Sequence, residues 1–192
     1  MKNEWQKFRD SFEKFVVQDL QKSLNAGVEV GTIILTVVGI ECLSGYFEGE
    51  PANDKTFKSF INEFMPNYSN HAEAIYKCIR NGLAHDYIIK ECDGKSFLFT
   101  RSRGERHLIP VANKPGWYYL NREDFASDFL QAQEKFFEEV SQNQKLYNKV
   151  LKRLNDRSFL DVFSFQSSTI FIDSNESTDE YDGATGTVRR KP

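Results

Sequence analysis

The chain has 192 residues, of which 40% are hydrophobic and 28% are charged, a size that supports one hydrophobic core and is too small for two ordinary domains. The formal charge of -3, from 25 basic and 28 acidic residues, argues against a histone-like, wholly cationic nucleic-acid binder. The three cysteines lack a C-x-x-C pair and only three histidines accompany them, so we expect no disulfide framework, no metal and no cofactor.

The N-terminal residues are charged and lack the continuous apolar run of a secretory signal. The longest stretch without a charged residue, Val30 to Ile40, has 11 residues, whereas a membrane-spanning helix needs about 20. The sequence therefore predicts a soluble, cytoplasmic protein that does not enter a membrane.

The first two predicted elements are helices. Hydrophobic residues at spacings of three and four over 4 to 24 are typical of an amphipathic helix, which Asn25 to Gly27 ends. Residues 28 to 47 are rich in Val, Ile and Thr, which favour strands, but this stretch without a turn signal is too long for an ordinary strand. We therefore expect a buried helix there, with Gly31 and Gly39 allowing close helix packing.

Two further helices are predicted before the middle of the chain. The apolar spacing over 57 to 64 indicates a short helix that Pro66 ends, and Ser69 or Asn70 is the expected cap of the next helix. That helix runs into the sequence Arg80-Asn81-Gly82-Leu83-Ala84-His85, where its glycine is expected to loosen or end it.

After this helix the hydrophobic pattern changes to a period of two, which is typical of strands. Asp93-Gly94 is a strong signal for a two-residue hairpin turn. The sequence predicts a small antiparallel β-meander over about 87–120, with strands at 87–92, 96–102, 108–111 and 117–120.

Asn121 is the expected cap of a long helix whose apolar residues recur at helical spacing as far as Asn155. Residues 158 to 172 hold enough apolar side chains to pack back on the core. Ser, Thr, Gly and acidic residues dominate 173–192, which predicts a disordered polar tail. We therefore expect a single, mainly α-helical domain over 1–172.

The sequence with the most chemical content is Arg80-Asn81-Gly82-Leu83-Ala84-His85, on a helix that follows amphipathic helices and precedes a long one. This arrangement resembles the HEPN superfamily, whose all-α domains carry an Arg, four to six residues and then a His, often with a polar residue after the Arg. Arg80, Asn81 and His85 match those positions. The resemblance covers roughly residues 1–157 in organisation, with the β-meander as an insertion before the last long helix.

The resemblance implies an HEPN-like helical bundle. In catalytic members of the superfamily this set of residues is a metal-independent RNase site that a second protomer completes. It thus implies an endoribonuclease of the toxin or defence type, with RNA, a second copy of the chain and a neutralising antitoxin or regulatory protein as partners. Other members are not catalytic, so the alternative is a partner-binding or nucleotide-binding module.

The residue types suit RNA cleavage. Histidine exchanges protons near neutral pH, so His85 is suited to deprotonate a ribose 2′-OH or to protonate the leaving 5′-oxygen. Arg80 offers N–H donors to phosphate oxygens as charge develops, and Asn81 is placed to orient either residue. The structural alternative is that Arg80 caps the helix end and His85 hydrogen-bonds within the core.

Arg101 and His107 form a second pair with a spacing that the family permits, but they lie in the predicted meander, outside a helical context. We expect them on opposite sides of an exposed turn, without a pocket or a helical neighbour. The candidate catalytic residues are therefore Arg80, Asn81 and His85.

A basic stretch lies near the end of the last predicted helix. Lys145, Lys149 and Lys152 share one helical face, and Arg153 adds a further cation. We expect these four residues to bind the RNA backbone. The alternative is a solvated face whose cations suit a helix C-terminus.

Overall fold

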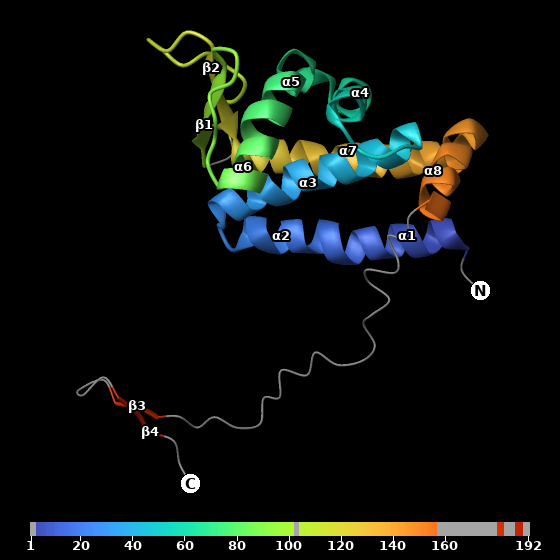
Figure 1. Cartoon of the computed structure of the whole chain (residues 1–192), viewed down its shortest axis with the longest axis horizontal. Helices are drawn as coiled ribbons and strands as arrows, with labels where there is room; N and C mark the ends of the chain where they lie inside the picture. The colour runs from blue at the N-terminus through green and yellow to red at the C-terminus, as the bar shows by residue number, and fades with distance from the viewer. Residues whose placement is uncertain (1–2, 102–103, 157–179, 183–186, 190–192) are drawn as a thin grey trace. The chain divides into compact units, whose positions relative to one another are not determined.

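The arrangement of the chain is given by a computed structural model (Figure 1). The residues that it describes are 3–101, 104–156, 180–182 and 187–189. The chain divides into two compact units, residues 1–160 and residues 161–192. The first unit is mainly helical and carries a small sheet, which confirms the predicted fold class in its coarse form.

In the second unit, β3 (Glu180–Asp182) pairs antiparallel with β4 (Thr187–Arg189). The other residues of this unit lie outside the described residues. So do the expectations that 158–172 pack on the core and that the domain ends at 172, as well as most of the tail predicted to be disordered.

The first predicted helix is confirmed. It consists of α1 (Glu4–Phe12), a π-helical turn (Glu13–Val17) and α2 (Gln18–Asn25), which follow one another without a break. The Asn3 side chain accepts a hydrogen bond from the Gln6 backbone at 2.8 Å and so caps its N-terminus. Its apolar stripe, which includes the buried Phe8, Phe12 and Leu20, faces the core.

The second predicted helix, α3 (Glu29–Glu48), is also confirmed and lies at the centre of the core. Gly39 allows α3 to approach α7 closely, because a Cβ at this position would lie 2.5 Å from the Phe129 ring. By length and composition α3 is apolar enough to cross a membrane, but 56% of that stretch is buried inside the protein. In this structure α3 therefore packs as a core helix, while a soluble, cytoplasmic protein remains a prediction.

The next helix, α4 (Asp54–Phe64), begins with a reciprocal cap. The Asn53 side chain accepts from the Thr56 backbone at 3.0 Å, and the Thr56 hydroxyl accepts from the Asn53 backbone at 2.9 Å. The helix ends before Pro66, as predicted.

A second long helical segment follows α4 and carries the motif. It begins with a 3₁₀ turn (Pro66–His71) and continues through α5 (Ala72–Ala74), a π-helical turn (Ile75–Arg80) and α6 (Asn81–Asp86). The prediction that Ser69 or Asn70 caps this helix is wrong. Both residues lie inside the 3₁₀ turn, and His71 is the residue that precedes α5.

The predicted antiparallel meander is wrong in its pairing. β1 (Ser96–Thr100) and β2 (Trp117–Asn121) run parallel to each other. Segment 108–111 lies on the other edge of β2 and runs antiparallel to it, because the Leu108 backbone N–H donates to the Tyr119 carbonyl at 2.8 Å. β2 is thus the middle of the sheet.

The length of the connection between β1 and β2 allows them to pair in parallel. Segment 108–111 reaches β2 through a tight turn and occupies one of its edges, so β1 takes the other edge. Parallel strands need a connection of about a dozen residues or more, and residues 101–116 provide one. The two-residue turn at Asp93-Gly94 is present, with Cys92 and Lys95 exchanging backbone hydrogen bonds of 2.9 Å, but 87–91 forms no strand.

Asn121 caps α7 (Arg122–Gln142), as predicted, because its side chain accepts from the Glu123 and Asp124 backbones at 3.0 and 3.1 Å. The prediction that this helix continues to Asn155 is wrong. Asn143 adopts an extended conformation and caps a separate helix, α8 (Gln144–Asp156).

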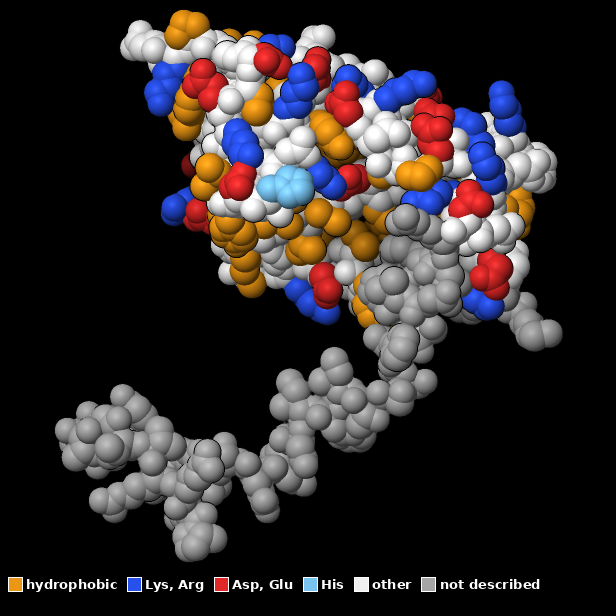
Figure 2. Space-filling model, viewed as in Figure 1, with side chains coloured by type: hydrophobic (Ala, Val, Ile, Leu, Met, Phe, Trp, Pro, Cys, Tyr) orange, Lys and Arg blue, Asp and Glu red, His pale blue; other side chains and the backbone are white. Residues whose placement is uncertain are grey.

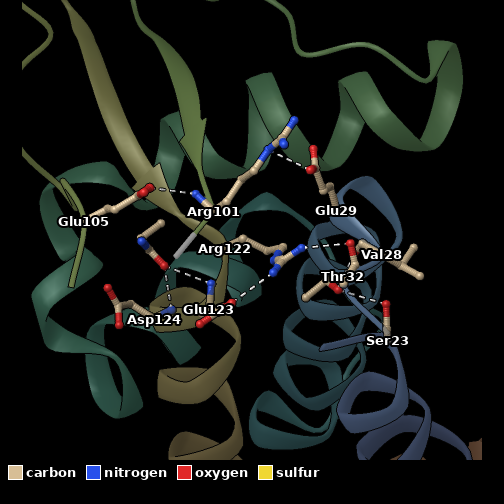
Figure 3. A network of polar contacts seen from close by, with 11 residues as sticks. Ser23, Val28, Glu29, Thr32, Arg101, Glu105, Arg122, Glu123 and Asp124 are labelled. Atoms are coloured by element: carbon tan, nitrogen blue, oxygen red, sulfur yellow. Dashed lines mark hydrogen bonds and ion pairs between the residues drawn. The ribbon is translucent and has the colours of Figure 1, made fainter. Parts of the chain in front are cut away.

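Two arginines tie the sheet to the turn between α2 and α3 (Figure 3). The buried Arg122 side chain, at the start of α7, donates from Nη1 to the Gly27 carbonyl at 3.1 Å. Arg101, directly after β1, pairs with Glu29 at the start of α3 at 2.7 Å. These contacts fix the sheet against the N-terminal end of the core helix.

Candidate functional site

The candidate catalytic residues lie at the junction of the π-helical turn and α6. The Asn81 backbone N–H bonds to the Tyr76 carbonyl, five residues earlier, so the π geometry extends to the motif itself. Beyond it, α6 is α-helical and ends at Tyr87, which adopts the left-handed conformation with φ 58°. The sequence prediction placed the loosening at Gly82, whereas the structure places it in the turn Ile75–Arg80, which ends at the arginine of the motif.

Arg80 is held firmly on the side of α3. Its Nε donates to Glu41 Oε2 at 2.8 Å, and its Nη2 lies 2.6 Å from Glu41 Oε1, so the guanidinium and the carboxylate form a bidentate pair. Nη1 donates to the Asn81 side-chain oxygen at 2.9 Å. The side chains of Arg80 and Glu41 are only 23% and 16% exposed, so solvent screens this pair weakly.

His85, in contrast, is exposed, and within the described residues its ring makes no hydrogen bond or ion pair. The neighbouring Asp86 pairs with Lys90. This hydrogen bond lowers the pKa of Asp86, and the charge of Lys90 and the nearness of His85 act in the same direction. His85 is therefore available to a group that comes from outside the described fold.

Arg80 and His85 do not point to the same side within one protomer. Five residues of α-helix turn about 140° past one full turn, and α6 keeps α geometry over this interval. The environments agree with this angle, since Arg80 is half-buried against Glu41 while His85 is exposed.

Gly82 has a structural reason to be in the motif. The segment after α6 folds back along the helix, with the Ile88 backbone donating to the Gly82 carbonyl at 3.3 Å and the Lys90 backbone to the Cys78 carbonyl at 3.0 Å. A Cβ on residue 82 would lie 2.3 Å from the Ile88 carbonyl oxygen. Glycine is therefore the residue that lets this segment approach.

The histidine of the second Arg-His pair is held by the fold, whereas its arginine, Arg101, is exposed. The His107 Nδ1 accepts from the Asn121 backbone at 2.9 Å, and its Nε2 lies 2.9 Å from the Tyr68 hydroxyl, which donates to Asp128 at 2.8 Å. Burial lowers the pKa of His107, and Asp124 and Asp128 oppose that effect. The expectation that His107 has no helical neighbour is wrong, because its ring contacts Tyr68 on the 3₁₀ turn and the backbone of Asn121, which caps α7.

The four cations expected to bind RNA lie on α8 and divide into two pairs. Lys145 and Lys152 are exposed. Lys149 pairs with Glu48 at 3.0 Å and lies over the Phe47 ring, so it fastens α8 to α3. Burial raises the pKa of Cys42 on α3 to about 12. The positive charge of Arg153 acts in the opposite direction. The structure thus gives Lys149 a role inside the fold and leaves Lys145 and Lys152 on the surface.

A surface cavity lies elsewhere, between α1, α7 and α8. Trp5, Arg9, Val140 and Tyr147 are among its lining residues, and none of the candidate catalytic residues lines it. Within the described residues, no group of three or more His, Cys, Asp or Glu side chains is placed to hold a metal ion.

The sequence did not predict the residues that contact the two Arg-His pairs. Glu41, the partner of Arg80, is 39 positions away from it in the chain. It is an acidic residue within the most apolar helix, and that position was the one available signal. Tyr68 and Asp128, which hold His107, gave no signal, because a tyrosine on a helical turn and an acidic residue on an amphipathic helix are common. Comparisons with family models, curated proteins and solved structures give no match.

Proposed function

We propose that the chain is a metal-independent endoribonuclease of the toxin or defence type, with an HEPN-like bundle that acts as a homodimer. The observation that carries the proposal is the contrast inside the motif. Arg80 is fixed by Glu41 and Asn81, whereas His85 is exposed and unengaged in the described part of the chain. A fixed cation and an exposed proton-transfer group, brought to one phosphate, are the minimum that phosphodiester cleavage by a 2′-OH requires.

Arg80 keeps hydrogen-bond donors that can bind a phosphate during RNA cleavage. Of the five guanidinium N–H donors, the three contacts to Glu41 and Asn81 leave two for phosphate oxygens. One His85 removes the 2′-OH proton, and the 2′-oxygen attacks the adjacent phosphorus. The bond to the 5′-oxygen breaks, and a second histidine donates the proton to that leaving group. The products are a 2′,3′-cyclic phosphate and a 5′-hydroxyl end.

A second protomer supplies the second histidine. The angle between Arg80 and His85 prevents one helix from presenting both to one phosphate, whereas a two-fold interface places the Arg of one protomer opposite the His of the other. Exposed hydrophobic side chains flank the motif, with Val38 three residues before Glu41 and Tyr87 and Ile88 directly after α6. Figure 2 shows a band of hydrophobic side chains beside a surface histidine on the face in view. Exposed apolar patches of this kind favour protein contacts.

Cleavage of total RNA in the presence of EDTA tests the proposal. The wild-type chain is expected to release fragments with 2′,3′-cyclic phosphate ends, and His85→Ala is expected to lower the rate at least about 100-fold. Arg101→Ala is the matched control from the other Arg-His pair and should keep the wild-type rate. Light scattering should give the mass of a dimer. A wild-type chain that leaves RNA intact, or a monomer at the assay concentration, would contradict the proposal.

One observation favours the non-catalytic alternative, a partner-binding module. Glu41 already neutralises Arg80, which reduces its attraction for a phosphate. In that case the exposed residues Val38, Tyr87 and Ile88 bind a partner protein, and the wild-type chain and His85→Ala leave RNA equally intact.

A further inference from the structure

The outer face of the small sheet is built differently from its inner face. Inward-facing residues such as Phe97 and Leu120 are buried against the helices, and Tyr118 packs edge-on against His71 at 4.5 Å. Side chains alternate along a strand, so Trp117 and Tyr119 point to the opposite side, where both keep part of their surface exposed.

The neighbouring strands extend this outer face on both sides. Leu98 lies opposite Tyr119 on β1. On the other edge, the bridge between Pro110 and Tyr118 places Ile109 beside Tyr119 on the same face, and Ile109 is exposed. The result is an apolar and aromatic surface across three chain segments.

Each aromatic ring on this face carries a cation. The Lys114 Nζ lies 4.3 Å from the centroid of the Trp117 ring. The Arg106 guanidinium lies 5.0 Å from the centroid of the Tyr119 ring and donates to its hydroxyl at 2.8 Å. Both cations are exposed, and within residues 3–101 and 104–156 neither pairs with a carboxylate. They differ in this from Lys149 of α8, which Glu48 neutralises.

We propose that this outer sheet face, defined as Leu98, Ile109, Trp117 and Tyr119 with Arg106 and Lys114, binds single-stranded RNA. Aromatic rings stack with unpaired bases, and cations beside the rings attract the phosphates that link those bases. Trp117 and Tyr119 are two positions apart on one strand, about 6.6 Å, so successive bases have separate rings. At the end of the first unit where Figure 1 places β1 and β2, Figure 2 shows Lys or Arg together with hydrophobic and acidic side chains.

This inference rests on the proposed function, because it names the form of RNA that would reach the cleavage site. Base-paired RNA keeps its bases stacked on one another, and the rings of this face then have no free base to bind. The two proposals involve different residues, so each can fail alone.

Tryptophan fluorescence gives the direct test. The chain has two tryptophans, and Trp5 is buried with its ring edge-on against Phe137, so quenching by a stacked base reports on Trp117. The full chain carrying His85→Ala is titrated with a 12-nucleotide single-stranded RNA. The emission is expected to fall. Duplex RNA of the same length should leave it unchanged.

Variants separate stacking from charge. Trp117→Leu is expected to weaken binding, followed by anisotropy of labelled RNA, at least about fivefold because one stacked base is lost. Arg106→Gln with Lys114→Gln should flatten the plot of log K against log salt by about 1.4, since each phosphate contact on a single strand contributes about 0.7. Lys14→Gln is the matched control, because Lys14 also lies over an aromatic ring, that of Phe15 at 4.8 Å. Circular dichroism checks that each variant is folded.

The outcomes distinguish this inference from the proposed function. Unchanged binding in Trp117→Leu, or equal quenching by duplex RNA or by poly-glutamate, would overturn the RNA-binding face even if the wild-type chain cleaves RNA. Quenching and a flattened salt slope in a chain that never cleaves RNA would support the face and overturn only the RNase.

Discussion

His85 and His107 both follow an arginine at similar spacing, yet their surroundings are opposite. His107 uses both ring nitrogens, one toward the Asn121 backbone and one toward the Tyr68 hydroxyl. His85 is exposed, and within the described residues its ring makes no hydrogen bond, although it lies near enough to Asp86 to act on it electrostatically. A histidine engaged on both sides stabilises the fold, and a free one is able to exchange protons with another molecule. The comparison teaches that surroundings, rather than spacing, separate a structural pair from a candidate catalytic pair.

The largest expected difference between the two histidines is in stability. His107→Ala removes the partner of the Asn121 backbone N–H and one of the two partners of the buried Tyr68 hydroxyl, which should lower the free energy of unfolding by about 2 kcal/mol. His85→Ala should change it by less than about 0.5 kcal/mol, as at other exposed positions. Urea denaturation measures both. Equal losses in the two variants would show that the comparison is mistaken.

The two arginines should differ in the opposite direction, because Arg80 of the candidate catalytic pair is anchored and Arg101 of the other pair is 75% exposed. Glu41→Gln leaves the half-buried Arg80 without its carboxylate and should cost about 1 to 2 kcal/mol. Glu29→Gln removes the partner of Arg101, which is 75% exposed. It should lower the free energy of unfolding by at most about 0.5 kcal/mol. Thermal unfolding of the pair of variants checks this order, and a larger loss for Glu29→Gln would reverse it.

The pH dependence of stability should report His107. Its folded pKa lies below the ordinary value of 6.5, so the unfolded chain binds a proton that the folded chain resists. The stabilisation is therefore complete above pH 6.5 and is lost as the pH falls from 6.5 toward the folded pKa. His71, whose pKa is lowered first by burial and then by Lys95, acts in the same direction.

Urea denaturation at pH 7.5 and at pH 5.5 measures this effect. The wild-type chain should be less stable at pH 5.5, with a slope of at most about 1.4 kcal/mol per pH unit for each histidine. His107→Gln should reduce the slope, and His71→Gln should remove a separate part of it. An unchanged slope in both variants would assign the acid sensitivity to other groups.

The smallest expected effect separates two lysines of α8. Lys149→Gln breaks a half-exposed ion pair with Glu48 and should cost about 0.5 kcal/mol, whereas Lys152→Gln should have no measurable effect on stability. Repeated urea denaturation of the two variants beside the wild-type chain measures this difference in the free energy of unfolding. A greater loss for Lys152→Gln would show that the division of the basic stretch is wrong.

Local patterns were sufficient to predict most of the helices. The apolar stripe of 4–24, the length of the apolar segment that became α3, and the capping side chain of Asn121 each act within a few residues of where they occur. Such effects are visible in a sequence because helix formation depends on neighbours three and four positions away.

The contacts that define the site are not local. Glu41 meets Arg80 across 39 positions, and Tyr68 meets Asp128 across 60. The parallel pairing of β1 with β2 likewise depends on segment 108–111 occupying the other edge of β2. The residues around each partner carry no pattern that predicts these long-range contacts, because the contacts form only when the helices pack together. The candidate catalytic residues were predicted from the sequence, but their partners were not.

The π-helical turn at Ile75–Arg80 has a consequence for how this segment tolerates changes in length. A π-helical turn closes hydrogen bonds over five residues rather than four, so it takes up one residue more than an α-helical turn. Deletion of a single residue here, such as the half-exposed Lys77, lets the turn relax to α geometry while Arg80 keeps facing Glu41. The same deletion inside α6 rotates His85 by about 100° relative to Arg80. A one-residue deletion before the arginine should therefore preserve the angle between Arg80 and His85, whereas one after it should change that angle.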